Sequence, residues 1–106
     1  MRVLLDACVP RGLRRSLSGH EVRTAPEMGW GSLDNGELLD AMSNQFDTLI
    51  TVDRRLPQQQ RLANRPFAVV VLRAKSNRLS DLLPLVPDLL TVLGGTQPGS
   101  VTEVGS

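Results

Sequence analysis

The sequence has little of several features that would indicate a function directly. Among its 106 residues there are one cysteine, one tryptophan, two phenylalanines and no tyrosine. With Cys8 as the only cysteine, no disulfide can form within the chain, which favours a reducing compartment. With so few aromatic side chains to stack on bases, a nucleic-acid-binding platform of the RRM or OB type is not expected.

A strong charge imbalance and long hydrophobic runs are also lacking. The formal net charge is +1, which is too small to indicate nucleic-acid binding by itself. No apolar run approaches the ~20 residues of a membrane span, and the apolar start of the chain is too short for a signal peptide. We therefore expect a cytoplasmic protein with no membrane partner. No glycine-rich phosphate loop follows a predicted strand, so a nucleotide-binding or phosphatase-like domain ranks last.

The length fits a single domain over residues 1–106, and the share of hydrophobic residues, 41%, is typical of soluble globular proteins. Patterning predicts strands at 2–5, 21–25, 48–52 and 68–72, with an edge strand at 101–104 before a loose end. Helices are predicted at 10–17, 35–43, near 58–62 and at 77–93, where Pro84 and Pro87 should break or kink the last one. This alternation predicts an α/β sandwich with a mainly parallel sheet.

Two aspartates directly follow predicted strands: Asp6 follows the first, and Asp53 follows the strand at 48–52. Parallel strands end at the same edge of a sheet, so the two carboxylates meet in one crevice if these strands are neighbours. Clustered carboxylates are what Mg²⁺ or Mn²⁺ requires, and Asp34 and Glu37 are further candidates. A cation there would lower the pKa of a bound water and neutralise charge on a phosphodiester.

Each of these acids also has a structural alternative. Asp6 and Asp53 could cap the helices that follow them. Asp34 and Glu37 have the spacing of a capping box at the start of the helix predicted at 35–43. Cys8 has no evident base to activate it, so a small packing role is expected for this residue.

Arginines follow both aspartates in the sequence. Arg11, Arg14 and Arg15 come after Asp6, and Arg54 and Arg55 come after Asp53. In a parallel sheet both groups lie near the same rim, where Arg11, Arg14 and Arg54 are expected to hold phosphates through bidentate hydrogen bonds. The alternative for any single arginine is solvation or pairing with a nearby acid.

Several segments are characteristic in their order and spacing; they lie at 1–10, 19–22, 27–30, 35–39, 49–57, 68–72 and 76–79. Together they cover nearly the whole chain, and in combination they resemble the compact bacterial PIN-like family, a group of largely uncharacterised domains in the PIN nuclease superfamily. The resemblance implies a three-layer α/β/α sandwich whose acids bind magnesium or manganese. It also implies endoribonuclease activity on RNA. Many characterised relatives are toxins of toxin–antitoxin pairs, and PIN relatives often form homodimers, so an antitoxin and a second copy are the implied protein partners.

The resemblance also assigns the acids position by position. Asp6 matches the first-strand acid, Asp53 matches the acid of the Thr-x-Asp motif, and Glu37 best matches the acid on the intervening helix. All three are thereby implied as metal ligands and catalytic residues. The sequence departs from the family pattern at Ala7, where relatives commonly carry glutamate, and in lacking a counterpart to a further acid. A catalytically weak or inactive module that binds RNA or protein is therefore the alternative function.

Overall fold

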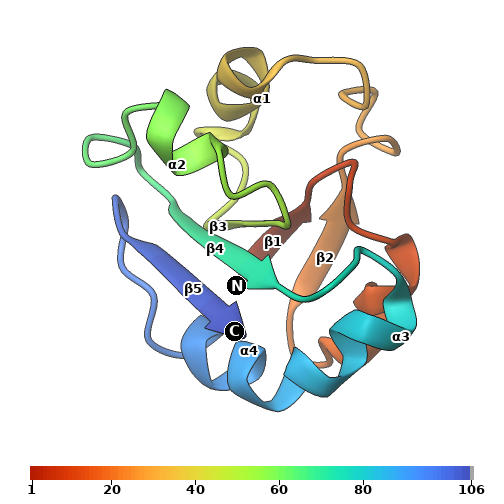
Figure 1. Cartoon of the computed structure of the whole chain (residues 1–106). Helices are drawn as coiled ribbons and strands as arrows, with labels where there is room; N and C mark the ends of the chain where they lie inside the picture. Colours follow the sequence, from red (N-terminus) through yellow and green to blue (C-terminus); the bar gives the residue numbers. More distant parts are fainter. Residues whose placement is uncertain (106) are drawn as a thin grey trace.

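The structure is a computed structural model and describes residues 1–105. A single five-stranded sheet runs through it in the order β2-β1-β3-β4-β5, with all neighbouring strands parallel (Figure 1). The strands are β1 (Arg2–Leu5), β2 (Glu21–Thr24), β3 (Thr48–Thr51), β4 (Ala68–Arg73) and β5 (Val101–Gly105). The predicted α/β class is confirmed, and the sheet is wholly rather than mainly parallel.

The helical connections are short. They are the 3₁₀ helix η1 (Arg11–Ser16), then α1 (Asn35–Met42), α2 (Leu56–Gln59), α3 (Leu79–Leu82), the 3₁₀ helix η2 (Leu83–Leu85) and α4 (Val86–Leu93). The helix predicted at 77–93 is divided as expected: Pro84 lies in η2, and Pro87 lies in the first turn of α4, where its missing N–H costs nothing. Among residues 1–105, no helix is both long enough and apolar enough to cross a membrane.

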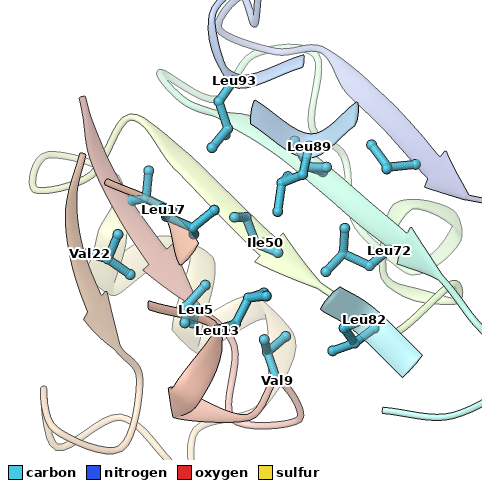
Figure 2. Close-up of a cluster of buried hydrophobic side chains, with 13 residues drawn as sticks. Leu5, Val9, Leu13, Leu17, Val22, Ile50, Leu72, Leu82, Leu89 and Leu93 are labelled. Atoms are coloured by element: carbon cyan, nitrogen blue, oxygen red, sulfur yellow. The ribbon is translucent and has the colours of Figure 1, made fainter. Parts of the chain in front are cut away.

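Alternating strand residues feed two hydrophobic clusters on opposite faces of the sheet. The first core contains Val3 and Leu5 of β1, and the second contains Leu4. The first core is completed by η1, α3 and α4 through Leu13, Leu17, Leu82, Leu89 and Leu93 (Figure 2). The second is completed by α1 and α2 through Leu38, Leu39, Met42 and Leu56. Figure 1 accordingly shows α1 and α2 on one side of the sheet and α3 and α4 on the other.

The chain leaves β1 and β3 toward opposite faces of the sheet. After β1 it passes through η1, on the first core, to reach β2. After β3 it passes through α2, on the second core, to reach β4. In a sheet of this order the divergence opens a crevice outside the carboxyl ends of β1 and β3, where open α/β sheets bind their ligands. Asp6 and Asp53 are the acids that follow these two strand ends.

The last connection has the opposite hand to the other three. The β2–β3 and β3–β4 connections move across the sheet in one direction with their helices on the second core. The β1–β2 connection moves the other way on the first core, which gives it the same hand. The β4–β5 connection continues in the direction of β3–β4, but its helices lie on the first core. Parallel connections share one hand in about 98% of cases, so the β4–β5 connection is an exception. Because of this hand, α3 and α4 cover a face of the sheet that η1 alone would leave open.

Candidate functional site

An open pocket of about 610 Å³ lies at the crevice between the ends of β1 and β3. Its lining comes from the loop after β1, the start of α1 and the segment after β3: Asp6, Ala7, Cys8, Asn35, Val52, Asp53, Arg54 and Arg55. The two strands are neighbours, because Leu5 pairs with Ile50 across them, so the condition on which the predicted meeting of the two acids depended is met. The structure therefore brings Asp6, Asp53 and Arg54 to one pocket.

Asp6 is anchored by hydrogen bonds at both carboxylate oxygens. Oδ1 accepts from the backbone N–H of Ala7 at 2.8 Å, and Oδ2 accepts from the Thr51 hydroxyl at 2.7 Å. The backbone N–H of Asp6 donates to the Ile50 carbonyl at 2.9 Å, which extends the ladder between β1 and β3 by one residue. Asp6 does not cap η1, whose N-cap is Pro10. The capping alternative is therefore wrong for Asp6, and its oxygens keep lone pairs for a further ligand.

Thr51, at the end of β3, connects the two aspartates. Its fully buried hydroxyl donates to Asp6 Oδ2 and accepts from the backbone N–H of Asp53 at 3.1 Å. One hydroxyl thus orients the Asp6 side chain and the turn that carries Asp53. Thr51 was not among the predicted site residues, although it stands two residues before Asp53 in the Thr-x-Asp motif.

Asp53 is held by Arg55. Its Oδ1 accepts from the Arg55 backbone N–H at 2.9 Å and from Arg55 Nε at 3.2 Å. The helix α2 has Arg55 as its N-cap and no side-chain cap, but the Asp53 carboxylate accepts from the N–H of Arg55 at the entrance to this helix, so Asp53 also has a structural role there. Partial burial raises the pKa of the Asp53 carboxyl. The hydrogen bonds from Arg55, the Arg55 charge and the Asn35 side chain together lower this pKa by a larger amount. The resulting pKa lies below its usual value, which keeps this carboxylate ionised.

Cys8 contacts the same cluster without being activated by it. Its Sγ lies 3.6 Å from Asp6 Oδ2 and 3.6 Å from the Thr51 hydroxyl. Burial raises the pKa of the Cys8 thiol, the backbone at Val52 lowers it, and the Asp6 charge raises it again, with a net upward shift. A thiol with a raised pKa stays protonated and is a poor nucleophile. Cys8 also packs against the first core, in agreement with the packing role expected for it.

Glu37 lies apart from the residues that line the pocket. It forms the predicted capping box of α1: its backbone N–H donates to Asp34 Oδ1 at 2.8 Å, and its Oε1 accepts from the Asp34 N–H at 3.1 Å. Within residues 1–105 there is no group of three or more His, Cys, Asp or Glu side chains arranged to hold a metal ion together. The structure thus does not join Glu37 to Asp6 and Asp53.

The residues of the pocket nevertheless fit a hard cation that retains much of its water. Asp6 and Asp53 offer carboxylate oxygens, and the side-chain amide of Asn35 offers a further oxygen in the same pocket. Both hydrogen bonds from Arg55 fall on Oδ1 of Asp53, which leaves Oδ2 for a ligand. Asn35 and Arg55 were not among the predicted site residues.

A second groove, of about 870 Å³, adjoins the pocket. It is lined by the loop after β1, by η1 and by the segment after β2: Ala7, Val9, Pro10, Arg11, Gly12, Arg14, Arg15, Thr24, Pro26 and Glu27. The structure places the predicted phosphate-binding residues Arg11 and Arg14 here rather than in the pocket with Asp6. Ala7 lines both hollows, so they are neighbours along the same edge of the sheet.

Comparison with known proteins gives no relative from which to infer a function: no protein-family model, no curated protein and no solved structure matches this chain.

Proposed function

We propose that this protein is a metal-dependent endoribonuclease of PIN type, built as a three-layer α/β/α sandwich, in which Asp6 and Asp53 hold Mg²⁺ or Mn²⁺. The observation that carries the proposal is the pair of carboxylates in the crevice where the connections of β1 and β3 diverge. The buried Thr51 hydroxyl binds the Asp6 carboxylate and the backbone N–H of Asp53. Packing does not require acids at these positions, and Asp6 does not cap the helix that follows it. A crevice at this point of the sheet is where a ligand is expected.

The chemistry divides among the residues of the pocket. A bound divalent cation would supply an activated water and charge stabilisation for phosphodiester hydrolysis. Asp6 and Asp53 hold the ion, and Asn35 adds an amide oxygen. Arg54, exposed at the pocket, binds the scissile phosphate by charge-assisted hydrogen bonds. Glu37 assists indirectly, because its capping box fixes the start of α1 and thereby Asn35.

The choice of RNA as substrate follows from the PIN-like resemblance of the sequence. The same resemblance suggests a toxin with an antitoxin partner and a homodimer, acting in the cytoplasm. These parts of the proposal rest on the order and spacing of the sequence segments, and the pocket contributes the hydrolytic chemistry.

The test is cleavage of single-stranded RNA with Mg²⁺ or Mn²⁺ by the full chain. Asp6→Asn and Asp53→Asn are each expected to reduce the cleavage rate by at least about 100-fold, a loss typical for a group that acts in the transition state, while circular dichroism shows a folded protein. A chelator should abolish activity. Glu37→Gln is the matched control, since glutamine still accepts the capping hydrogen bond. Activity that survives both aspartate substitutions, or the chelator, would refute the proposal.

One observation favours the second function, a binding module without turnover. The pocket contains two carboxylates rather than three, and Arg55 already bonds one of them. This function predicts RNA binding with no product in any divalent metal, and no heat when Mn²⁺ is titrated into the protein in a calorimeter. Heat that disappears in Asp6→Asn would instead favour the nuclease.

A further inference from the structure

We propose that the groove beside the pocket is a second phosphate subsite, so that the substrate is one RNA strand running from the pocket across Ala7 and along η1. This inference rests on the proposed function and extends it from a site for one phosphate to a path for several. The arginines of the groove then set how long a substrate must be, and the acids of the pocket set where it is cut.

The two hollows are placed to share one strand. Ala7 lines both, and it follows Asp6 directly. The small, exposed side chain of Ala7 adds no negative charge between the hollows. A phosphate backbone can therefore pass from Asp6 to the groove without meeting a carboxylate on the way.

The groove carries an excess of positive charge at one wall. Arg11, Arg14 and Arg15 come from η1, and Glu27 is the one acid among the lining residues. In a 3₁₀ helix residues three apart lie on the same side, so Arg11 and Arg14 lie along one line. Arg11 and Arg15 are exposed, and within residues 1–105 neither forms an ion pair. Their guanidinium groups are free to bind phosphate.

Arg14 is held in place by a partner that is itself fixed. Its Nη2 donates to Glu27 Oε1 at 2.7 Å, and the same oxygen accepts from the Thr24 backbone N–H at 2.7 Å. The hydrogen bond from Thr24 lowers the pKa of Glu27, and the hydrogen bond and charge of Arg14 lower it further. Glu27 therefore stays ionised and holds Arg14 against the groove.

Arg14 also has an unused donor. Its Nε is buried and has no hydrogen-bond partner among the described residues. An unpaired buried donor is costly, and the oxygen of a phosphate is an acceptor suited to a guanidinium. Because this Nε is buried, a phosphate oxygen in the groove reaches it only when the Arg14 side chain turns toward the strand.

The ligand chemistry is that of a phosphate backbone rather than of particular bases. None of the residues that line the groove is aromatic, so there is no surface for bases to stack on. Arginine contacts to phosphates fix the path of the strand without reading its sequence. We therefore expect binding that depends on length and salt and varies little with base composition.

The experiment compares a dinucleotide, which can fill only the pocket, with a single-stranded oligonucleotide longer than the ~4–16 nucleotides that single-strand-binding folds cover. Arg11→Gln and Arg15→Gln are the main variants, and Arg61→Gln is the control, because Arg61 is exposed and lines neither hollow. Each main variant should raise the KM for the long RNA by about tenfold and leave cleavage of the dinucleotide unchanged. The slope of log affinity against log salt should fall by about 0.7 for each arginine removed.

Binding measured in the Asp53→Asn background separates this inference from the proposed function. If the long RNA binds, and binding weakens in Arg15→Gln, the groove is a phosphate subsite whether or not the wild type cleaves RNA. If the wild type cleaves RNA but Arg11→Gln and Arg15→Gln behave like Arg61→Gln, the subsite is refuted and the nuclease stands. If polyglutamate binds the groove and RNA does not, the groove is a protein-docking site and the inference is wrong.

Discussion

At the scale of single residues, Thr51 organises the candidate site more than either aspartate does. It is fully buried, and its hydroxyl serves both Asp6 and the backbone of Asp53. Asp6 and Asp53 share no direct hydrogen bond, so their relative position depends on this side chain. A threonine on a buried strand would ordinarily be replaceable by valine, which has the same shape.

We expect Thr51→Val to be costly for that reason. Removing the hydroxyl leaves the Asp53 N–H without a partner and leaves Asp6 Oδ2 only the weak contact with the Cys8 thiol. This loss should lower the free energy of unfolding by about 1–3 kcal/mol. Urea unfolding followed by circular dichroism measures this loss, and Mn²⁺ titration should show weaker binding as well. Thr51→Ser restores the hydroxyl and should recover both properties. A valine variant as stable as the wild type would show that the hydroxyl does not organise the site.

The loss of unfolding free energy at low pH also depends on single residues. The folded state lowers the pKa of Glu27 through the Thr24 backbone and Arg14, and it lowers the pKa of Asp53 as well. A carboxyl whose pKa is lower in the folded state than in the unfolded chain adds to the free energy of unfolding. This contribution is complete at a pH above the pKa in the unfolded chain, which is near 4.5 for Glu27. It is lost as the pH falls through the pKa in the folded state. We expect Glu27→Gln to flatten the fall in unfolding free energy below that pH. A Glu27→Gln variant whose stability falls with pH as steeply as that of the wild type would contradict this role of Glu27.

At the scale of elements, the attachment of β5 depends on a glycine that precedes it. Gly99 has φ = +83°, and a Cβ there would collide with the Ala63 carbonyl oxygen. Its backbone N–H also donates to the Phe67 carbonyl at 2.9 Å, directly before β4. The turn into β5 is therefore pressed against the segment that leads into β4.

Gly99→Ala should accordingly destabilise the protein more than an ordinary glycine substitution. Gly19 is the matched control, since its φ is +88° but nothing lies within 4 Å of an added Cβ. Gly19→Ala should cost about 1 kcal/mol for the left-handed backbone alone, and Gly99→Ala an additional ~1–3 kcal/mol for the collision. Thermal and urea unfolding of both variants provide the comparison. Equal losses would contradict the close approach of the two segments.

Elements set by local chemistry were predictable, and those set by tertiary contact were less so. The capping box of Asp34 and Glu37 and the breaks at Pro84 and Pro87 follow from spacing within a few residues, and both are present. The segment 10–17 reads as an ordinary helix, but it forms the 3₁₀ helix η1, which buries Leu13 in the first core and is followed by the buried Leu17. The local pattern of leucines does not distinguish a 3₁₀ helix from an α-helix.

At the scale of the whole molecule, the exceptional hand of the β4–β5 connection determines how the first core is closed. The helices α3 and α4 add Leu82, Leu89 and Leu93 to a face that β1, β3 and β4 also bury. A connection of the usual hand would have placed these helices on the second core, beside α1 and α2. The stability of the domain therefore depends on its last third.

Leu89→Ala tests this dependence. Leu89 is buried in the first core, and its truncation should cost about 2–5 kcal/mol, as for other large-to-small core substitutions. Leu83→Ala is the control: this side chain is 42% exposed, and its loss should change stability by no more than about 0.5 kcal/mol. Urea unfolding measures both. Similar small effects would mean that α4 does not close the core.

The global arrangement also explains which parts of the site were predictable. Asp6 and Asp53 stand at strand ends, so a parallel sheet was enough to bring them to one edge. Thr51, Asn35 and Arg55 enter the site through side-chain directions and strand register, which the alternation of elements does not specify. Arg11 and Arg14 were expected at the same rim as Asp6, and they lie on that rim in the adjoining groove.

The connection between β4 and β5 has a consequence for when the site can exist during synthesis. Asn77, on the loop after β4, donates from Nδ2 to the Cys8 carbonyl at 3.0 Å and so secures the loop that carries Asp6. The first core beneath that loop is closed by α3 and α4 together with η1. A ribosome that has released only the first four strands thus holds a chain that lacks the Asn77 contact and both of the last two helices. We expect the loop that carries Asp6 to be held less firmly in that chain than in the complete domain.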